Sequence, residues 1–326
     1  MKNEPSIDVC LCLYNGEKYI REQLLSIFRN ATGRFRIIIS DGGSTDSSLS
    51  IVRDLIVGHP QLDIVLLLSE GSRLKVIQNF SKVLENSTAD YVFISDQDDL
   101  WSEFKVSHMM ASMAIENERF DGPILITTDA KLIDDRGCVI GESLRKNLKQ
   151  PVCNLVSPEY LIAQNILPGC TFLLNRSAVN LVLPISANSV MHDWWISSLC
   201  TLYGRVVYID EPLHYYRLHS SNLVGQPKLS IIKKIFDVKA RLTSSRKFIS
   251  QTKAIISRIR VLEIPHGRSD LIFQLLKLGR YRNIELGVAV MFMTGRFKKT
   301  GWMRRVSAIV NFSLLSIGFF GVGHHD

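Results

Sequence analysis

The sequence predicts a doubly wound α/β fold with a mainly parallel sheet, because two patterns alternate along its first half. Short apolar runs of strand length are each followed by a segment whose apolar residues recur at helical spacing, and turns rich in Gly, Asn, Asp and Ser separate them. The predicted strands are Ile7–Leu13, Phe35–Ser40, Ile64–Leu68, Tyr91–Ser95 and Ile124–Thr128. The predicted helices are Glu17–Arg29, Ser47–Val57, Val76–Glu85 and Lys105–Glu118.

The alternation loosens after the fourth strand. A hairpin turn is predicted at Asp134–Gly137, because this segment is acidic and ends in glycine. Further helices are predicted at Pro158–Gln164, Asp193–Tyr203 and Leu229–Leu262. In a sheet of this kind, ligands bind beyond the carboxyl ends of the strands, so we examine those ends for chemistry.

The composition is that of a globular protein, and the charge is divided unevenly between two regions. The chain has 326 residues, 46% of them hydrophobic and 21% charged, which excludes general disorder. Its six cysteines include no Cys-x-x-Cys pair, and no apolar signal segment opens the chain, so we expect a reducing cytoplasm. Residues 1–227 hold 20 Lys+Arg against 26 Asp+Glu, whereas residues 228–326 hold 19 against 5.

The basic region suits an anionic membrane surface. It has no zinc-ligand spacing and no aromatic RNA motif, so we expect no nucleic-acid partner. Val306–Gly323 contains no charged residue, but serines, glycines and an asparagine dilute it. With Arg304 and Arg305 before it, this segment favours a helix lying on the membrane, while a core helix and a membrane span are the alternatives.

The strongest local signal is the strand Tyr91–Ser95, which ends in three carboxylates within four residues, Asp96, Asp98 and Asp99. Carboxylates this close repel one another, and a divalent cation relieves that repulsion. Mg²⁺ and Mn²⁺ prefer oxygen ligands, and Mg²⁺ commonly bridges one or two carboxylates to substrate phosphates. The pattern therefore predicts a Mg²⁺ or Mn²⁺ site, with a solvated acidic turn as the alternative.

Several ordered motifs together resemble the inverting family 2 glycosyltransferases. These motifs are Ile7–Gly16, Ile39–Asp46, Asp96–Trp101 and His192–Trp195, and the first also precedes a predicted helix. Asp96–Trp101 and the segments Ile209–Pro212 and Tyr216–Gly225 look most like the bacterial rhamnosyltransferase branch. The resemblance covers about residues 5–225. It implies a GT-A type fold, with a catalytic domain at 1–225 and a basic, mainly helical C-terminal region at 226–326.

The resemblance also implies which residues bind the nucleotide. Leu13, Tyr14, Asn15 and Glu17 would line the nucleobase pocket. Asp41 would accept a hydrogen bond from the pyrimidine N–H, because an ionised carboxylate is an acceptor only. The alternative for Asp41 is a turn or helix-capping role, since two glycines follow it.

The same resemblance assigns the acidic motif. Asp96 would lie near the ribose and the diphosphate together with Gln97, and Asp98 would be the direct metal ligand. Asp99 either holds the loop or approaches the donor sugar, and both roles stay open. His219 would reach the metal or the diphosphate, with a structural histidine as the alternative. Arg73 and Lys75 are interpreted as solvated surface charge.

Asp193 is the predicted catalytic base, because inversion requires a carboxylate that accepts the proton of the attacking hydroxyl. Helix capping is the competing interpretation of Asp193. Trp194 and Trp195 are expected in the core rather than against a sugar. Cys170 is not expected to be a nucleophile, because no histidine pairing is visible.

The function implied by the resemblance is transfer of a sugar from a nucleotide diphosphate donor to a lipid-linked oligosaccharide in bacterial surface polysaccharide synthesis. The first expectation for the donor is dTDP-L-rhamnose, and a UDP-hexose is the second. The enzyme would lie in the cytoplasm, peripherally on the inner face of the plasma membrane. A dinucleotide oxidoreductase is disfavoured, because no Gly-x-Gly-x-x-Gly opens the first helix. A noncatalytic nucleotide-sugar-binding protein is the remaining alternative.

Overall fold

The computed structural model describes residues 4–219, 238–263, 272 and 275. In these residues, nine strands form one sheet in the order β3-β2-β1-β4-β8-β6-β9-β5, with β7 paired to β6. The strands are β1 (Ile7–Leu13), β2 (Phe35–Asp41), β3 (Asp63–Leu67), β4 (Tyr91–Ser95), β5 (Leu100–Trp101), β6 (Ile124–Ile133), β7 (Val139–Gly141), β8 (Leu173–Asn175) and β9 (Arg205–Arg217).

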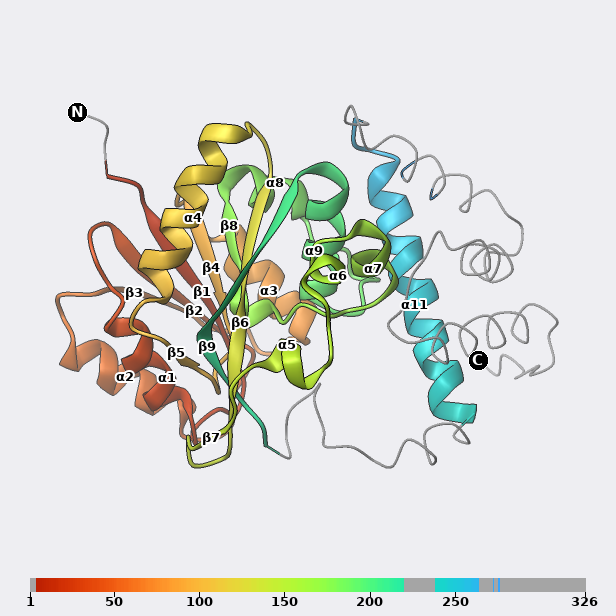
Figure 1. The fold of residues 1–326 in the computed structure, drawn as a ribbon. Coiled ribbons are helices and arrows are strands. Elements are labelled where there is room, and N and C mark those ends of the chain that lie inside the picture. Colours follow the sequence, from red (N-terminus) through yellow and green to blue (C-terminus); the bar gives the residue numbers. More distant parts are fainter. Residues whose placement is uncertain (1–3, 220–237, 264–271, 273–274, 276–326) are drawn as a thin grey trace.

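Helices cover both faces of this sheet (Figure 1), which confirms the predicted doubly wound fold. The helices are α1 (Ile20–Phe28), α2 (Ser48–Gly58), α3 (Val76–Glu85), α4 (Lys105–Arg119), α5 (Leu144–Asn147), α6 (Val152–Leu155), α7 (Pro158–Ala163), the 3-10 turn η1 (Gly169–Thr171), α8 (Arg176–Val182), α9 (His192–Tyr203) and α11 (Val238–Ile259). The predicted helix Leu229–Leu262 is observed as α11, and its first residues lie outside the described ranges.

The parallel half of the sheet places the site. β1 is parallel to β2 on one side and to β4 on the other, and β2 is parallel to β3. Along the sheet, β2 and β3 lie on one side of β1 and β4 lies on its other side, so the chain changes its direction of travel across the sheet between β1 and β4. A crevice opens at such a reversal, beyond the carboxyl ends of the strands. The ends of β1 and β4, at Leu13 and Ser95, lie at this point.

The other half of the sheet is mixed. β8 is antiparallel to both β4 and β6, and β9 is parallel to β6. The two-residue strand β5 pairs antiparallel with the end of β9, which sets Trp101 opposite His214. This pairing brings the residues that follow Asp99 against the end of β9.

One hydrophobic core lies on each face of the sheet. Apolar side chains of α1, α2 and α4 form the first core, and those of α3, α8, α9 and α11 form the second. Trp194 and Trp195 are buried, as expected. The ring of Phe248 on α11 lies 6.0 Å from that of Trp194, and Arg258 on the same helix donates hydrogen bonds to two carbonyl groups at the end of α8. The described part of the C-terminal region thus shares the core of the sheet domain.

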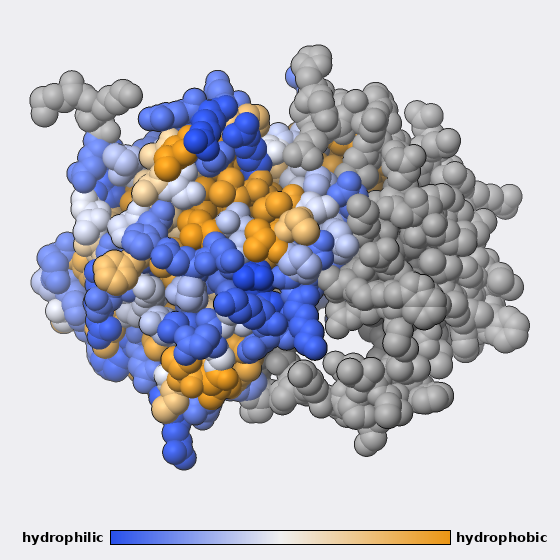
Figure 2. Space-filling model, in the orientation of Figure 1, coloured by the Kyte–Doolittle hydropathy of each residue, from blue (hydrophilic) through white to orange (hydrophobic). Residues whose placement is uncertain are grey.

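Among the described residues, no helix is long and apolar enough to cross a membrane. Val306–Gly323, for which a membrane-surface helix is predicted, lies outside those residues. Figure 2 shows apolar residues gathered in two places on this face, one at its middle over β6 and β9 and one near β7, where Val139 and Ile140 are exposed. These two residues lie in β7, the second strand of the hairpin. The turn predicted at Asp134–Gly137 is confirmed by the hydrogen bond from Gly137 N–H to the Asp134 carbonyl.

Candidate active site

Side-chain hydrogen bonds join the loops that follow β1 and β2. Asn15, with a φ of 48°, accepts a bond of 2.8 Å from the Thr45 N–H, and its own N–H donates to the Ser44 hydroxyl. The Glu17 carboxylate accepts from the Ser47 N–H at 2.9 Å. Two of the predicted nucleobase-binding residues, Asn15 and Glu17, therefore fix the loop that follows Asp41.

Asp41 forms the turn that ends β2. Its carboxylate is buried and accepts the N–H of Gly43 at 2.9 Å and that of Ser44 at 3.1 Å. Gly43 has a φ of 92°, a conformation that favours glycine. Leu13 lies opposite Asp41 in the sheet with its side chain in the core, and its carbonyl accepts the Gly42 N–H. Asp41 thus has the turn role, and base recognition by its remaining acceptor capacity stays a prediction.

Gln97 connects the ends of β1 and β4. Its side-chain oxygen accepts the Tyr14 N–H at 2.7 Å, and its side-chain nitrogen donates to the Tyr14 carbonyl at 3.0 Å. A Cβ atom at Gly16 would lie 2.6 Å from this oxygen, so the contact requires glycine there. The Arg73 side chain is exposed, as expected for a surface charge, and its guanidinium lies 4.2 Å from the centroid of the Tyr14 ring.

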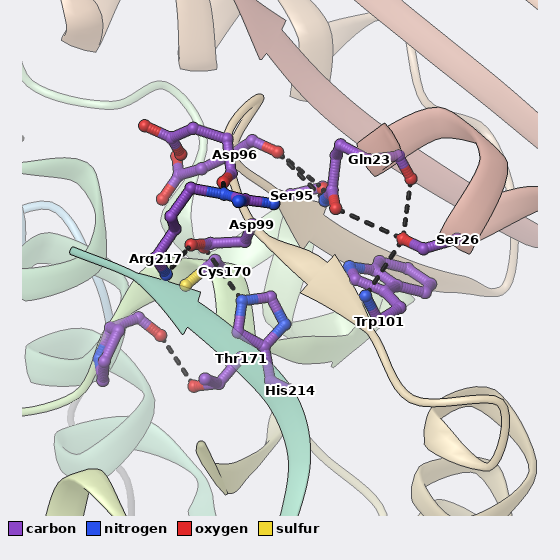
Figure 3. A network of polar contacts seen from close by, with 12 residues as sticks. Gln23, Ser26, Ser95, Asp96, Asp99, Trp101, Cys170, Thr171, His214 and Arg217 are labelled. Atoms are coloured by element: carbon purple, nitrogen blue, oxygen red, sulfur yellow. Dashed lines mark hydrogen bonds and ion pairs between the residues drawn. The ribbon is translucent and has the colours of Figure 1, made fainter. Parts of the chain in front are cut away.

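Asp96 lies at the carboxyl end of β4. The buried Gln23 of α1 donates to the Asp96 carbonyl and to the Ser95 hydroxyl, which fixes the end of the strand (Figure 3). Burial raises the pKa of the Asp96 carboxyl well above its usual value, and the charges of Asp98, Asp99 and Asp193 raise it further. A cation near this cluster would favour the ionised carboxylates.

The two predicted metal ligands lie together. His219 Nε2 is 2.9 Å from Asp98 Oδ2, and the His219 ring lies 5.0 Å from the ring of Tyr19. Burial raises the pKa of Asp98, and the contact with His219 opposes this. A carboxylate oxygen is a ligand that suits Mg²⁺ and Mn²⁺, whereas an imidazole nitrogen suits transition-metal ions better than it suits Mg²⁺.

Asp99 holds the acidic loop to β9. Its Oδ2 is 2.9 Å from His214 Nε2, and its Oδ1 accepts the Arg217 N–H at 2.9 Å (Figure 3). Burial raises the pKa of Asp99, but His214 and these hydrogen bonds outweigh it and the pKa is lowered overall. Of the two roles open for Asp99, these contacts are those of the residue that holds the loop.

Arg217 ties three segments to the same loop, and the sequence did not single it out. Its side chain is almost fully buried, and Nε donates to the Asp98 carbonyl at 2.8 Å. Nη2 donates to the Glu22 carboxylate of α1 at 2.9 Å, and Nη1 donates to the Asp135 carbonyl of the β6–β7 hairpin at 3.2 Å. The planar guanidinium has enough donors in fixed directions to serve all of them.

Asp193 lies in the first turn of α9 on the other side of the site. Its Oδ1 accepts a bond of 2.8 Å from the Asn165 amide and another from the Trp194 N–H. Burial raises the pKa of Asp193 to about 6, although those hydrogen bonds lower it. The charge of Asp193 raises the pKa of Asp96, and η1 lies between the two loops: a Cβ atom at Gly169 would lie 3.1 Å from Asp193 Cβ, and the next residue, Cys170, lies beside Asp99. The predicted base and the predicted donor site are therefore adjacent.

His192 precedes Asp193, the predicted base, and is a neutral imidazole. Its ring stacks on Phe80 at 3.5 Å between centroids, and a Cβ atom at Gly169 would lie 2.5 Å from its Nε2. Burial lowers the pKa of His192 to about 3. The stacked ring fixes the start of α9 and hence the backbone of Asp193.

Residues 8–133, which include β1 to β6 and the acidic loop, match the family model described as Glycosyl transferase family 2. The chain carries a glycosyl transferase family 2 domain. The matched residues hold every candidate donor-binding residue and Asp98, while Asp193 and His219 lie beyond the match.

Proteins that are similar to this chain include the dTDP-rhamnosyl transferase RfbG of Shigella flexneri. The two are 27% identical over 226 residues, which cover 66% of this chain and 73% of that protein. The family assignment made from the ordered motifs is thereby confirmed.

Solved structures confirm the GT-A type fold. S. aureus TarS 1-349 in complex with UDP-GlcNAc has a TM-score of 0.56 at 16% identity, covering 96% of this chain and 81% of that one. The mannosyltransferase PcManGT from Pyrobaculum calidifontis, in complex with GDP-Man and Mn²⁺, has a TM-score of 0.54 at 14% identity, covering 97% and 81%. At these identities the likeness concerns the fold alone.

Proposed function

We propose that this family 2 glycosyltransferase is an inverting, metal-dependent enzyme that transfers a sugar from a nucleotide diphosphate donor to an acceptor hydroxyl. The supporting observation is the position of Asp193, a buried carboxylate that packs against Gly169 of η1 and whose charge raises the pKa of Asp96. A base on one side of a reacting carbon and a diphosphate site on the other are what inversion requires.

Asp98 and His219 would hold a Mg²⁺ or Mn²⁺ ion. Burial and the neighbouring carboxylates raise the pKa values of Asp96 and Asp98, and a bound cation would offset that cost by stabilising the ionised carboxylates. When bound, the ion supplies stabilisation of negative charge on the departing diphosphate. Arg217 positions this pair by donating to the Asp98 carbonyl and by anchoring the β9 strand that precedes His219.

Asp193 accepts the proton of the acceptor hydroxyl while that oxygen forms its bond to the anomeric carbon. The bond from this carbon to the diphosphate oxygen breaks on the opposite side, and its electron pair leaves with the diphosphate. With a pKa of about 6, Asp193 is ionised at neutral pH and is a stronger base than an ordinary carboxylate. Asn165 orients the carboxylate through its amide N–H.

The proposed donor is dTDP-L-rhamnose, which is supported by the similarity to the Shigella flexneri rhamnosyl transferase. A UDP-hexose is the second candidate, because Asp41 would face the same pyrimidine edge in either nucleotide. The proposed acceptor is a lipid-linked glycan at the inner face of the plasma membrane. The excess of basic residues in 228–326 supports this location.

A thermal-shift screen of the full chain with nucleotides and nucleotide sugars, each with and without Mn²⁺, tests the proposal. Ligands stabilise the native state that binds them. We expect dTDP and UDP compounds to raise the melting temperature more than GDP compounds, and only in the presence of Mn²⁺. Equal stabilisation by purine nucleotides, or full transfer activity in EDTA, would contradict the proposal. NMR of the product should show an inverted anomeric configuration.

A further inference from the structure

A lysine lies completely buried beneath the acidic loop, where no catalytic step uses it. Lys105 is the first residue of α4, and its side chain has no exposed surface. Its Nζ donates to the Cys170 carbonyl at 2.7 Å, lies 3.0 Å from His214 Nδ1 and sits 4.2 Å from the centroid of the Trp101 ring. These are three acceptors for the three N–H groups of an ammonium ion, so the geometry indicates a buried cation. Burial lowers the pKa of Lys105 to about 7, although the charges of Asp99 and Asp96 raise it, so the ammonium form is fully populated below neutral pH.

The contact with His214 fixes the tautomer of that imidazole. An ammonium group has no acceptor, so Nδ1 must be the unprotonated nitrogen and the proton must lie on Nε2. His214 Nε2 then donates to Asp99 Oδ2, from which it lies 2.9 Å. Burial and the neighbouring Lys105 lower the pKa of His214 to about 4, which agrees with a neutral ring. A neutral imidazole therefore connects a buried cation to a buried carboxylate.

Asp99, Cys170 and His214 have ligand atoms within 4.8 Å of one another, which is close enough for a metal ion. The hydrogen bonds of His214 argue that Lys105 supplies the positive charge there instead. Both of its ring nitrogens are engaged, one by Lys105 and the other by Asp99.

We propose that Lys105 is a positioning residue for the loop that carries Asp98. The Lys105 ammonium group holds the neutral His214 imidazole by a hydrogen bond at Nδ1, and His214 Nε2 in turn holds the Asp99 carboxylate of that loop. The remaining link is the other oxygen of Asp99, which accepts the Arg217 N–H, while Arg217 Nε binds the Asp98 carbonyl. The effect on metal binding rests on the proposed function, whereas the charge coupling between Lys105 and Asp99 does not.

The test combines two measurements on the full chain, Mn²⁺ affinity and the thermal denaturation midpoint. Lys105→Met keeps the length of the side chain and removes its charge. We expect it to weaken Mn²⁺ binding by about 10-fold or more, the size of effect seen when outer-shell partners of metal ligands are lost. Arg119→Met, at the exposed end of the same helix, is the control and should bind Mn²⁺ like the wild type. A folded Lys105→Met variant with wild-type Mn²⁺ affinity overturns the proposal.

The denaturation midpoints test the charge coupling without any ligand. Asp99→Asn leaves the ammonium without its counter-charge, so the double variant with Lys105→Met should melt at a higher temperature than Asp99→Asn alone. If Lys105→Met does not fold alone, folding of the double variant supports the proposal. Additive losses, or a double variant that does not fold, overturn it. Coupled midpoints in a chain that binds no Mn²⁺ would refute the proposed function and leave the anchoring role standing.

Discussion

The Asn165 side-chain amide donates a hydrogen bond of 2.8 Å to the Asp193 carboxylate. Asn165 follows α7 by two residues, and Asp193 lies in the first turn of α9, so the bond joins two segments that lie far apart in the sequence. It stabilises the ionised form of a carboxyl whose burial favours the neutral form. The bond therefore sets the pH at which the proposed base becomes active.

The pH profile of the Asn165→Ala variant follows from this bond. In the wild type, activity should fall as the pH drops through about 6, because protonated Asp193 cannot accept the acceptor's proton. Removing the amide donor raises the pKa of Asp193, so the acid limb of kcat/KM should move to higher pH. Asn188→Ala, at an exposed position, is the control. An unchanged limb would mean that Asp193 does not control the profile.

Asp193→Asn should separate binding from transfer. The amide keeps the size of the side chain but cannot take a proton, so kcat should fall by about 10² to 10⁴ fold. Donor affinity, measured by calorimetry with Mn²⁺ and the nucleotide sugar, should stay near the wild-type value. Asp54→Asn on the exposed side of α2 provides the matched control. Wild-type turnover in Asp193→Asn would place the base elsewhere.

Gln97→Glu should loosen the junction between β1 and β4. A carboxylate still accepts the Tyr14 N–H but meets the Tyr14 carbonyl with an oxygen instead of an N–H donor. The free energy of unfolding should fall by about 1–3 kcal/mol, measured by urea denaturation, and the donor KM should rise. Gln78→Glu is a matched control, because Gln78 Oε1 accepts the Lys75 N–H and a carboxylate oxygen can accept the same bond. Equal stability of the two variants would contradict the role of Gln97.

Removal of residues 296–326 should release the protein from anionic membranes. This segment carries Arg296, Lys298, Lys299, Arg304 and Arg305, and each basic residue near an anionic surface contributes about 1 kcal/mol of attraction. Co-sedimentation with vesicles containing phosphatidylglycerol should detect the full chain at low salt and less of it at high salt. Retention of the shortened chain on these vesicles would refute anchoring by this segment.

The parallel half of the fold follows from local sequence patterns. β1, β4 and α3 begin and end at the residues predicted, because each apolar run is bounded by turn residues. β9 was not predicted. It contains Pro212, and its pairing with β6 shifts register beside that residue, so the alternation typical of a strand is broken. β5 has only two residues and forms because β9 lies beside it.

The candidate site was predictable where its residues are adjacent in sequence, as in the acidic loop after β4. Lys105, His214 and Arg217 were not singled out, because their contacts depend on the pairing of β5 with β9. One signal for Lys105 was present. It falls four residues before Met109 and eight before Met113, on the buried stripe of α4, where an apolar residue is expected.

The packing of α11 on α9 makes the stability of the sheet domain depend on the C-terminal region. Phe248 lies against Trp194, the residue next to Asp193, and the Gln251 side chain accepts the Val190 N–H just before α9. A chain that ended near residue 225 would lack α11, so the α9 surface around Trp194 would be exposed to water. The helix that carries Asp193 would then lose part of its packing. A segment that replaced α11 would therefore have to supply the same contacts to α9 and to the residues just before it.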